Sequence, residues 1–204
     1  HDTDIVFETL GEIGLRASIG KCMMDAADDA PARLREQTSR SIDESLALKK
    51  RWDGAASGRL RAAFAPRFAV SCSRELLEAV ASLSSSQETI VHTHASESRD
   101  EVDVVRQKSG GFSNLEYLAD TGLATGRLCA AHCVWVTDRE QALLAERDVK
   151  VLHCPGSNLK LGSGLAPVAE MRARGISVSL GADGAACNNR LDMFEEIRLA
   201  ATIQ

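Results

Sequence analysis

Apolar runs and amphipathic segments alternate along the whole chain. Short runs rich in Val, Ile, Leu and Ala predict strands, and each is followed by a segment whose apolar positions recur at helical spacing. The predicted strands are Leu15–Gly20, Arg59–Ala65, Thr89–Ala95, Leu128–Val136, Lys150–Cys154 and Ser177–Gly181. No Asn-Gly hairpin pair stands between them. Strand and helix in alternation therefore predict right-handed βαβ units and a parallel sheet.

The predicted helices are delimited by capping residues as well as by periodicity. Ser73 and Thr137 are expected N-caps, and Gly14 is expected to end the first helix. The helices are Asp4–Ile13, Ala32–Trp52, the segment after Ser73, Ser98–Gln107, Asn114–Asp120, Asp138–Arg147, Ala166–Arg174 and Leu191–Ile203. The acidic, Ala-rich segment 25–31 is expected to be a loop.

A polar residue closes several of the predicted strands. The residues are His94, His132, His153 and Asp183, each at the end of an apolar run with a loop after it. Active sites of (β/α)8 barrels lie at the carboxyl ends of the strands. A doubly wound sheet is the alternative, but it gathers its site at one switch point. The pattern favours an α/β fold of the metal-dependent-hydrolase TIM-barrel type.

The length of 204 residues is enough for one domain with a real core. A complete barrel usually takes about 250 residues, so we expect a partial barrel in a single domain 1–204. The chain starts at His1 and ends at Gln204 within a helical pattern. We therefore expect it to be a piece of a longer protein.

The charge and the cysteines narrow the class of protein. The formal net charge is −5 without a basic run, which argues against nucleic acid and anionic membranes as partners. No apolar stretch approaches the roughly 20 residues that cross a bilayer. None of the six cysteines stands in a Cys-x-x-Cys pair. We expect a reduced, cytoplasmic protein.

His94 and Glu97 are the first candidates for chemistry. A His at a strand end can offer a ring nitrogen to a divalent metal. A Glu three residues later can reach the same cavity and carry a proton to and from water. The competing interpretation is a core His beside a solvated Glu. His92 lies on the same face of the strand as His94, and we expect it to pack or to support the site.

His132 and Asp183 end two later strands. A carboxylate at a strand end can bind metal and accept a proton from water, whereas the structural alternative for Asp183 is a turn or helix cap. An isolated His132 in so apolar a run would be a core residue. Two further candidates in register on other strands weaken both alternatives.

A polar loop and an arginine are candidates for substrate binding. His153, Ser157 and Asn158 could hold a polar ring by its heteroatoms, or could bond within their loop. The guanidinium of Arg67, after Pro66, either donates hydrogen bonds at the barrel mouth or forms a surface salt bridge. Phe68 is expected in the pocket wall or the core.

These motifs together resemble the amidohydrolase superfamily. They are His-x-x-Glu (94–97), Ala-His-Cys-Val (131–134), His-Cys-Pro-Gly-Ser-Asn-Leu-Lys-Leu (153–161) and Leu-Gly-Ala-Asp-Gly (180–184). The branch holds guanine deaminases, S-adenosylhomocysteine/methylthioadenosine deaminases and triazine hydrolases. The resemblance runs along nearly the whole chain, and its last two motifs are the most specific.

The resemblance implies roles for individual residues. His94, His132 and Asp183 would bind the metal, zinc in the first place with ferrous iron as the alternative. Glu97, His132 and Asp183 would be catalytic, with Glu97 moving protons. The residues expected to face the substrate are Arg67, Phe68, His153, Ser157 and Asn158.

The implied reaction is hydrolytic deamination. A metal-activated hydroxide would attack the amino-bearing carbon of a small heterocycle, and Glu97 would protonate the neighbouring ring nitrogen before ammonia leaves. Ala-Pro-Arg67-Phe68 resembles guanine deaminases, whereas the segment after Asp183 is more similar to adenosine-type and triazine enzymes. The expected substrate is a purine-like heterocycle of guanine or adenosine type.

One departure from the family pattern is the His-x-His pair of the first barrel strand, which no upstream strand carries here. The resemblance therefore implies a chain that holds about strands 3 to 8 of the barrel and half a metal site, and that is inactive alone. Triazine hydrolysis is a second enzymatic hypothesis, and a non-catalytic amidohydrolase-like scaffold is a rival from another class. A homodimer is expected, because strand edges left open invite pairing with another chain.

Overall fold

The computed structural model describes residues 2–26 and 31–203. These residues form two compact units, 1–92 and 93–204, and each is described by itself. Residues 27–30 of the acidic segment expected to be a loop lie outside the described range. The prediction of a single domain stays a prediction.

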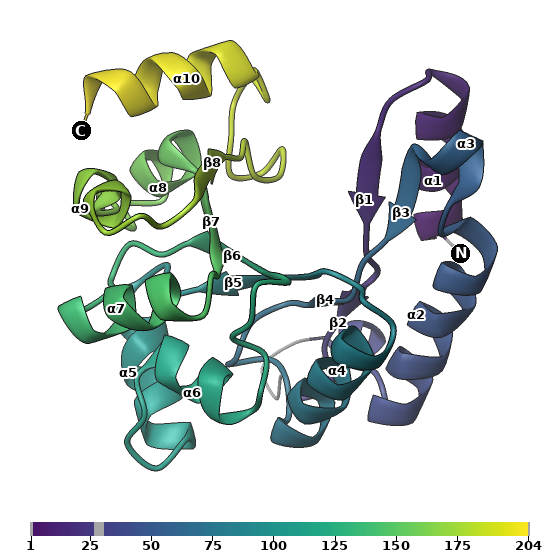
Figure 1. Ribbon diagram of the computed structural model, residues 1–204, viewed down its shortest axis with the longest axis horizontal. Helices are drawn as coiled ribbons and strands as arrows, with labels where there is room; N and C mark the ends of the chain where they lie inside the picture. The colour runs from purple at the N-terminus through teal and green to yellow at the C-terminus, as the bar shows by residue number, and fades with distance from the viewer. Residues whose placement is uncertain (1, 27–30, 204) are drawn as a thin grey trace. The chain divides into compact units, whose positions relative to one another are not determined.

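The first unit contains short parallel strands and the helices that cover them (Figure 1). In chain order its elements are α1 (Asp2–Glu12), β1 (Ala17–Ile19), β2 (Cys22–Met23), the 3-10 helix η1 (Ala32–Leu34), α2 (Thr38–Trp52), α3 (Ala55–Gly58), β3 (Leu60–Ala62), β4 (Ala65–Pro66) and α4 (Arg74–Ser86). Strand β1 pairs with β3 and β2 pairs with β4, both in parallel. Strand β5 (Val91–Ala95) begins in this unit with a parallel bridge from Val91 to Phe64.

Two predictions for the first unit need correction at their edges. The strand expected over 59–65 is divided into β3 and β4, and β4 extends to Pro66. Pro is tolerated there because the end of a strand does not need its missing N–H. The helix expected over 32–52 begins as η1, and α2 starts only at Thr38.

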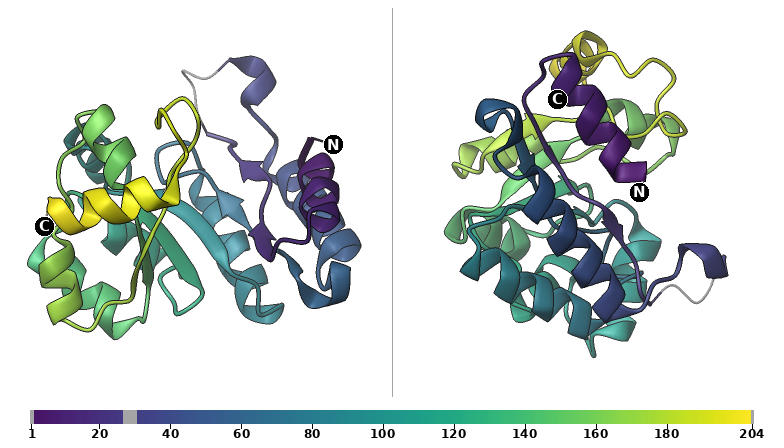
Figure 2. Two further views of the ribbon diagram at one scale, coloured as in Figure 1. Left: turned by 90° about the horizontal axis from the view of Figure 1, so that it is seen from above. Right: turned by 90° about the vertical axis from the view of Figure 1, so that its right-hand side faces the viewer.

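A small core holds α1 and α2 on the strands. Phe7 is fully buried and its ring stacks on Trp52, with centroids 5.3 Å apart. Leu48, Leu60 and Ala62 complete this cluster. Figure 2 shows the purple helix α1 running beside α2. The helical spacing of apolar positions thus places one face of each helix on the sheet.

Close packing between the first strands depends on Gly20. A Cβ at this position would lie 2.8 Å from the Ala63 carbonyl oxygen and 2.8 Å from the Ala65 Cβ. The neighbouring Ile19 carbonyl accepts a hydrogen bond from the Ala63 amide at 2.9 Å. Only glycine lets the two backbones approach this closely.

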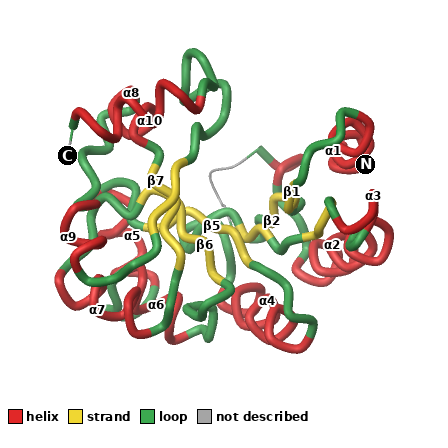
Figure 3. Tube along the Cα trace, turned by 45° about the horizontal axis from the view of Figure 1, so that its top comes forward, coloured by secondary structure: helices red, strands yellow, loops and turns green. Residues whose placement is uncertain are grey.

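The second unit is built on a sheet with the strand order β5-β6-β7-β8. Its strands after β5 are β6 (Leu128–His132), β7 (Lys150–His153) and β8 (Val178–Leu180). The helices are α5 (Arg99–Lys108), α6 (Asn114–Asp120), α7 (Asp138–Glu146), α8 (Pro155–Lys160), α9 (Val168–Ala173) and α10 (Met193–Thr202). Figure 3 shows the four strands side by side with the helices of the unit around them. The ladders β6–β7 and β7–β8 are parallel, which confirms the predicted topology.

Local signals placed most helices of this unit correctly. The Thr137 side chain accepts from the Glu140 amide, and Ser98 accepts from the Glu101 amide. The predicted strand over 128–136 is wrong in its second half, because β6 ends at His132 and the chain turns there. The loop predicted after β7 is also wrong: Pro155 begins the short helix α8, where proline at the first helical position loses no bond.

Two further observations concern the cysteines and the helices. All six cysteines are free thiols. Within residues 2–26 and 31–203, no helix combines the length and the apolar character that a membrane crossing requires.

Candidate active site

Left-handed backbone marks three strand ends of the second unit. Ser96 follows β5 with φ 53°, His132 ends β6 with φ 71°, and Asp183 follows β8 with φ 59°. A side chain other than glycine in this region costs roughly 1 kcal/mol or more. The turns hold each other in place, since the Ser96 carbonyl accepts from the amides of Val134 and Trp135 at 3.0 and 2.9 Å. Such strain is characteristic of sites where a side chain must take one direction.

His94 and His132 lie against each other at adjacent strand ends. Their rings stack with centroids 5.2 Å apart and planes inclined by 25°. His132 is 1% exposed and His94 is half-buried. Glu97 lies beside this pair, with its Oε2 3.7 Å from His132 Nε2. The structure thus brings together three residues that the sequence predicted for one site.

Glu97 also has a partner in the loop after α8. The Ser163 hydroxyl donates to Glu97 Oε1 at 3.4 Å. Ser163 is positioned by its backbone, because its amide donates to the Asn158 carbonyl and its own carbonyl accepts from the Trp135 indole at 2.7 Å. The Glu97 side chain keeps 24% of its surface exposed, so it can exchange protons with a bound molecule.

Asp183 accepts two short hydrogen bonds. The Ser157 hydroxyl donates to Oδ2 and the Gly184 amide donates to Oδ1, both at 2.6 Å. Burial acts to raise the pKa of the carboxyl, but these hydrogen bonds and the electrostatic interaction with the His132 and His94 rings outweigh it. The net effect lowers the pKa of Asp183 below its usual value, so the carboxylate stays ionised at neutral pH.

The side chains of Ser157 and Asn158 contact other candidate site residues, Asp183 and His132. The Asn158 Oδ1 lies 2.8 Å from His132 Nδ1, and Ser157 holds Asp183 as described. Both are fully buried, Ser157 at 0% and Asn158 at 1% exposure. The structure therefore gives them supporting contacts that the sequence did not foresee, and their predicted contact with substrate stays a prediction.

His153 is the unusual member of the group. It is 1% exposed, and neither ring nitrogen has a hydrogen-bond partner. Burial lowers the pKa of the imidazole, with a smaller opposing effect from Glu196 and a further lowering by His132. The ring is therefore neutral at physiological pH and keeps a donor and an acceptor for another molecule.

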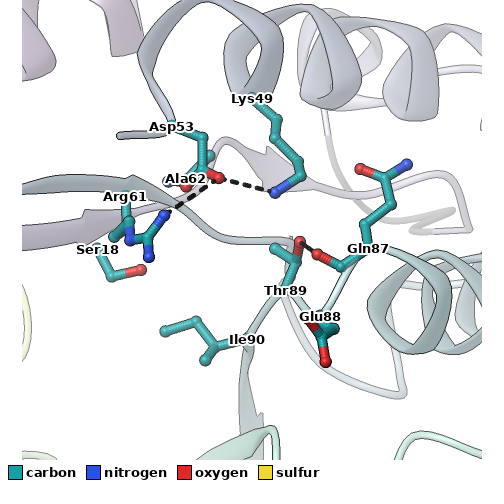
Figure 4. A pocket seen from close by; sticks show the side chains of 9 residues that line it. All are labelled: Ser18, Lys49, Asp53, Arg61, Ala62, Gln87, Glu88, Thr89 and Ile90. Carbon is teal, nitrogen blue, oxygen red and sulfur yellow. Dashed lines mark hydrogen bonds and ion pairs between the residues drawn. The ribbon is translucent and has the colours of Figure 1, made fainter. Parts of the chain in front are cut away.

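Arg67 and Phe68 belong to the first unit. Arg67 is exposed, its guanidinium carbon lies 4.8 Å from the centroid of the Phe68 ring, and its amide donates to the Met23 carbonyl at 3.0 Å. Their role in substrate binding stays a prediction. The first unit also has a cavity of about 430 Å³ (Figure 4). Within it Lys49 and Arg61 both pair with Asp53.

Glu101 is a residue of the site that the sequence analysis did not single out. It is 7% exposed and accepts from the backbone amides of Ser96 at 3.2 Å and Glu97 at 2.7 Å, and also from the Asn114 side chain. Burial raises the pKa of this carboxyl despite those bonds. The Ser-x-x-Glu spacing from Ser98 to Glu101 is a capping signal that could have drawn attention to it.

The donor set fits a divalent metal in its chemistry. Two imidazoles and a carboxylate are the ligands that zinc prefers when thiolates are absent. Burial raises the pKa of Cys133, and it raises the pKa of Cys154 to about 12, so both of these neighbouring thiols stay protonated at neutral pH. Within the described residues, however, no three His, Cys, Asp or Glu side chains approach closely enough to hold an ion together. His94, His132 and Asp183 stay the predicted ligands.

The sequence matches a known family and several curated relatives. The Amidohydrolase family matches residues 1–204. The chain is 43% identical over 201 residues to the 5'-deoxyadenosine deaminase of Methanothermobacter thermautotrophicus, covering 98% of this chain and 45% of that protein. It is 38% identical over 201 residues to 5-methylthioadenosine/S-adenosylhomocysteine deaminase 2 of Archaeoglobus fulgidus, covering 98% and 47%. The chain thus spans about half the length of the curated relatives it matches.

Solved structures show the same fold. A guanine deaminase from C. acetobutylicum with bound guanine matches with TM-score 0.91 at 30% identity, over 97% of this chain and 47% of that one. An adenosine deaminase from Xanthomonas campestris with bound zinc gives 0.88 at 32%, over 98% and 44%. The zinc complex of atrazine chlorohydrolase TrzN from Arthrobacter aurescens TC1 gives 0.92 at 25%, over 98% and 45%. These matches confirm the predicted partial barrel of the metal-dependent-hydrolase type.

Proposed function

Since this chain belongs to the amidohydrolase family, we propose that it forms part of a metal-dependent deaminase of an aminated, purine-like heterocycle. The observation that carries the proposal is the arrangement of His94, Glu97, His132 and Asp183 at strand ends of one unit. Deaminases of adenosine-type compounds among the relatives support the adenosine type of substrate over the guanine type.

The metal we propose is zinc, because two related structures contain it and because the donor types suit it. His94, His132 and Asp183 would hold it in part. When bound, it would supply a Lewis acid that lowers the pKa of water toward about 7. All other steps depend on side chains of this chain.

Each side chain has a distinct task in the hydrolysis. Asp183, ionised at neutral pH, accepts a proton from the attacking water. Because His132 Nδ1 faces Asn158, its Nε2 atom is the nitrogen that can contact either that water or the metal. Glu97 takes the other proton of this water and delivers it to the ring nitrogen beside the amino-bearing carbon. A bond forms from the water oxygen to this carbon, the C–N bond breaks, and the proton that Asp183 accepted passes to the leaving amino group, which departs as ammonia.

A substrate panel tests the proposal. Ammonia release should be measured from 5'-deoxyadenosine, 5'-methylthioadenosine and guanine, with the protein in the longest form that its gene encodes. We expect Glu97→Gln to lower kcat by about 10²- to 10⁴-fold, as loss of a general acid–base group does. The exposed Glu170→Gln is the matched control. Turnover unaffected by Glu97→Gln would refute the assignment.

Triazine hydrolysis is the second candidate, because the atrazine chlorohydrolase matches with a TM-score of 0.92. Chloride release from a chlorotriazine, compared with ammonia release from the purines, separates the two reactions. No turnover of either class, together with no bound metal, would favour the non-catalytic scaffold. The homodimer and the cytoplasmic location also stay predictions, and light scattering of the purified protein tests the first.

A further inference from the structure

The contact between Asn158 and His132 determines where the imidazole hydrogen lies. The two atoms that meet are Asn158 Oδ1 and His132 Nδ1, 2.8 Å apart. An amide oxygen can only accept a hydrogen bond. The nitrogen that faces it must therefore carry the ring hydrogen.

The consequence falls on the opposite side of the ring. A neutral imidazole has one N–H, so Nε2 is left with a lone pair. Nε2 is also the nitrogen that lies 3.7 Å from Glu97 Oε2. The Nε2 lone pair of His132 thus lies on the side of the ring where Glu97 is found.

Asn158 is itself held firmly enough to act in this way. The backbone amide of Asn158 donates to the Cys154 carbonyl at 2.9 Å, and its backbone carbonyl accepts from the Ser163 amide at 2.8 Å. Both partners of the contact are 1% exposed, so water does not compete for either atom. The Asn158 Nδ2 atom is buried without a hydrogen-bond partner. An amide turned by 180° would present this nitrogen to His132 and require the opposite tautomer.

We infer that Asn158 is a positioning residue that fixes His132 in its Nδ1–H tautomer and keeps the Nε2 lone pair available to the reaction. The inference rests on the proposed function only for the role of His132. The predicted contact of Asn158 with substrate stays a prediction beside this role. The contact acts on the substrate through His132, because a ligand-binding imidazole depends on the partner of its other nitrogen.

The test is the ¹⁵N NMR spectrum of the histidine rings in this chain at a pH where they are neutral. His132→Gln identifies the His132 signals among the five histidines. We expect the pyridine-like shift on Nε2 and the pyrrole-like shift on Nδ1. The opposite pattern in the unmodified chain would overturn the inference.

Variants then show whether Asn158 is the cause. Asn158→Asp keeps an oxygen acceptor and should retain the pattern, whereas Asn158→Leu should average or reverse it. The exposed Asn189→Leu, in the loop before α10, should leave it unchanged. A spectrum of Asn158→Leu identical to that of the unmodified chain would also overturn the inference.

A kinetic measurement separates this inference from the proposed function. If the protein deaminates purines, Asn158→Leu should lower kcat by about 10- to 100-fold, a usual cost of losing such a partner, and Asn158→Asp should restore most of it. The NMR pattern needs neither metal nor substrate. An NMR pattern that contradicts the expected tautomer would not contradict the proposed reaction. Absence of turnover would not contradict the tautomer.

Discussion

Glu101 offers the sharpest test of how the loop after β5 is held in place. The perturbation is Glu101→Leu, which removes the acceptor for three buried donors, the amides of Ser96 and Glu97 and the side chain of Asn114. Each donor left without a partner costs about 1–3 kcal/mol. The substitution also removes the desolvation cost of the buried carboxylate, which offsets part of this sum. We therefore expect a loss of about 3 kcal/mol in the free energy of unfolding.

The assay is urea unfolding of the chain, combined with hydrogen exchange of the Ser96 and Glu97 amides. Both amides should lose protection in Glu101→Leu, because their acceptor has gone. The matched control is Glu170→Leu, since Glu170 also occupies the third position of a helix but is exposed. We expect the control to change stability by less than about 0.5 kcal/mol.

The pH dependence of stability provides an independent check with Glu101→Gln. Burial raises the pKa of Glu101 above the ordinary value of 4.5 in the folded chain. The folded state therefore binds more protons than the unfolded state above pH 4.5, and stability falls as the pH rises from 4.5 through the folded pKa. Glu101→Gln should remove this slope. Unchanged stability and amide protection in Glu101→Leu would refute the reasoning.

Two further predictions concern residues with unusual surroundings. His153→Leu should stabilise the chain by about 1 kcal/mol, because two buried nitrogens without partners disappear. The pKa of His153 is lowered in the folded chain, so below pH 6.5 the unfolded state binds a proton that the folded state does not bind, and stability falls. His153→Leu should also remove this loss of stability. Urea unfolding at several pH values measures both effects, and an unaltered pH profile would contradict them. Gly20→Ala should destabilise by about 1–3 kcal/mol through collision with Ala63 and Ala65. Gly11→Ala, within α1 and with only an ordinary contact to Leu60 nearby, should be neutral or stabilise by up to about 1 kcal/mol; equal effects of the two substitutions would contradict this.

The sequence was sufficient for features that depend on local chemistry. Ser73 and Thr137 cap the helices that they were predicted to cap. Strands alternating with helices implied parallel pairing, and the ladders from β6 to β8 show it. His94, Glu97 and His132 were expected together because each lies at or just after a strand end, and strand ends of a parallel sheet meet.

The remaining features depend on contacts that no local pattern records. The partner of Asn158 is 26 residues earlier in the chain, so its polar character alone could not separate support of His132 from contact with substrate. The turn at His132 requires positive φ in a run that otherwise has the composition of a strand. Glu101 has the charge of a surface residue, and only burial among three donors gives it its role.

Buried glutamates recur at the loops of the second unit. Glu101 binds the loop after β5, Glu140 binds Thr137 and the amide of Leu115, and Glu196 binds the amide of Gly156 and the side chain of Asn188. Two of these carboxylates join segments that belong to different strand–helix repeats. Loop grafting between relatives would therefore succeed only if the glutamate and both of its partners were exchanged together. Two loops that are joined by a carboxylate should therefore be exchanged as a pair when the substrate range is re-engineered.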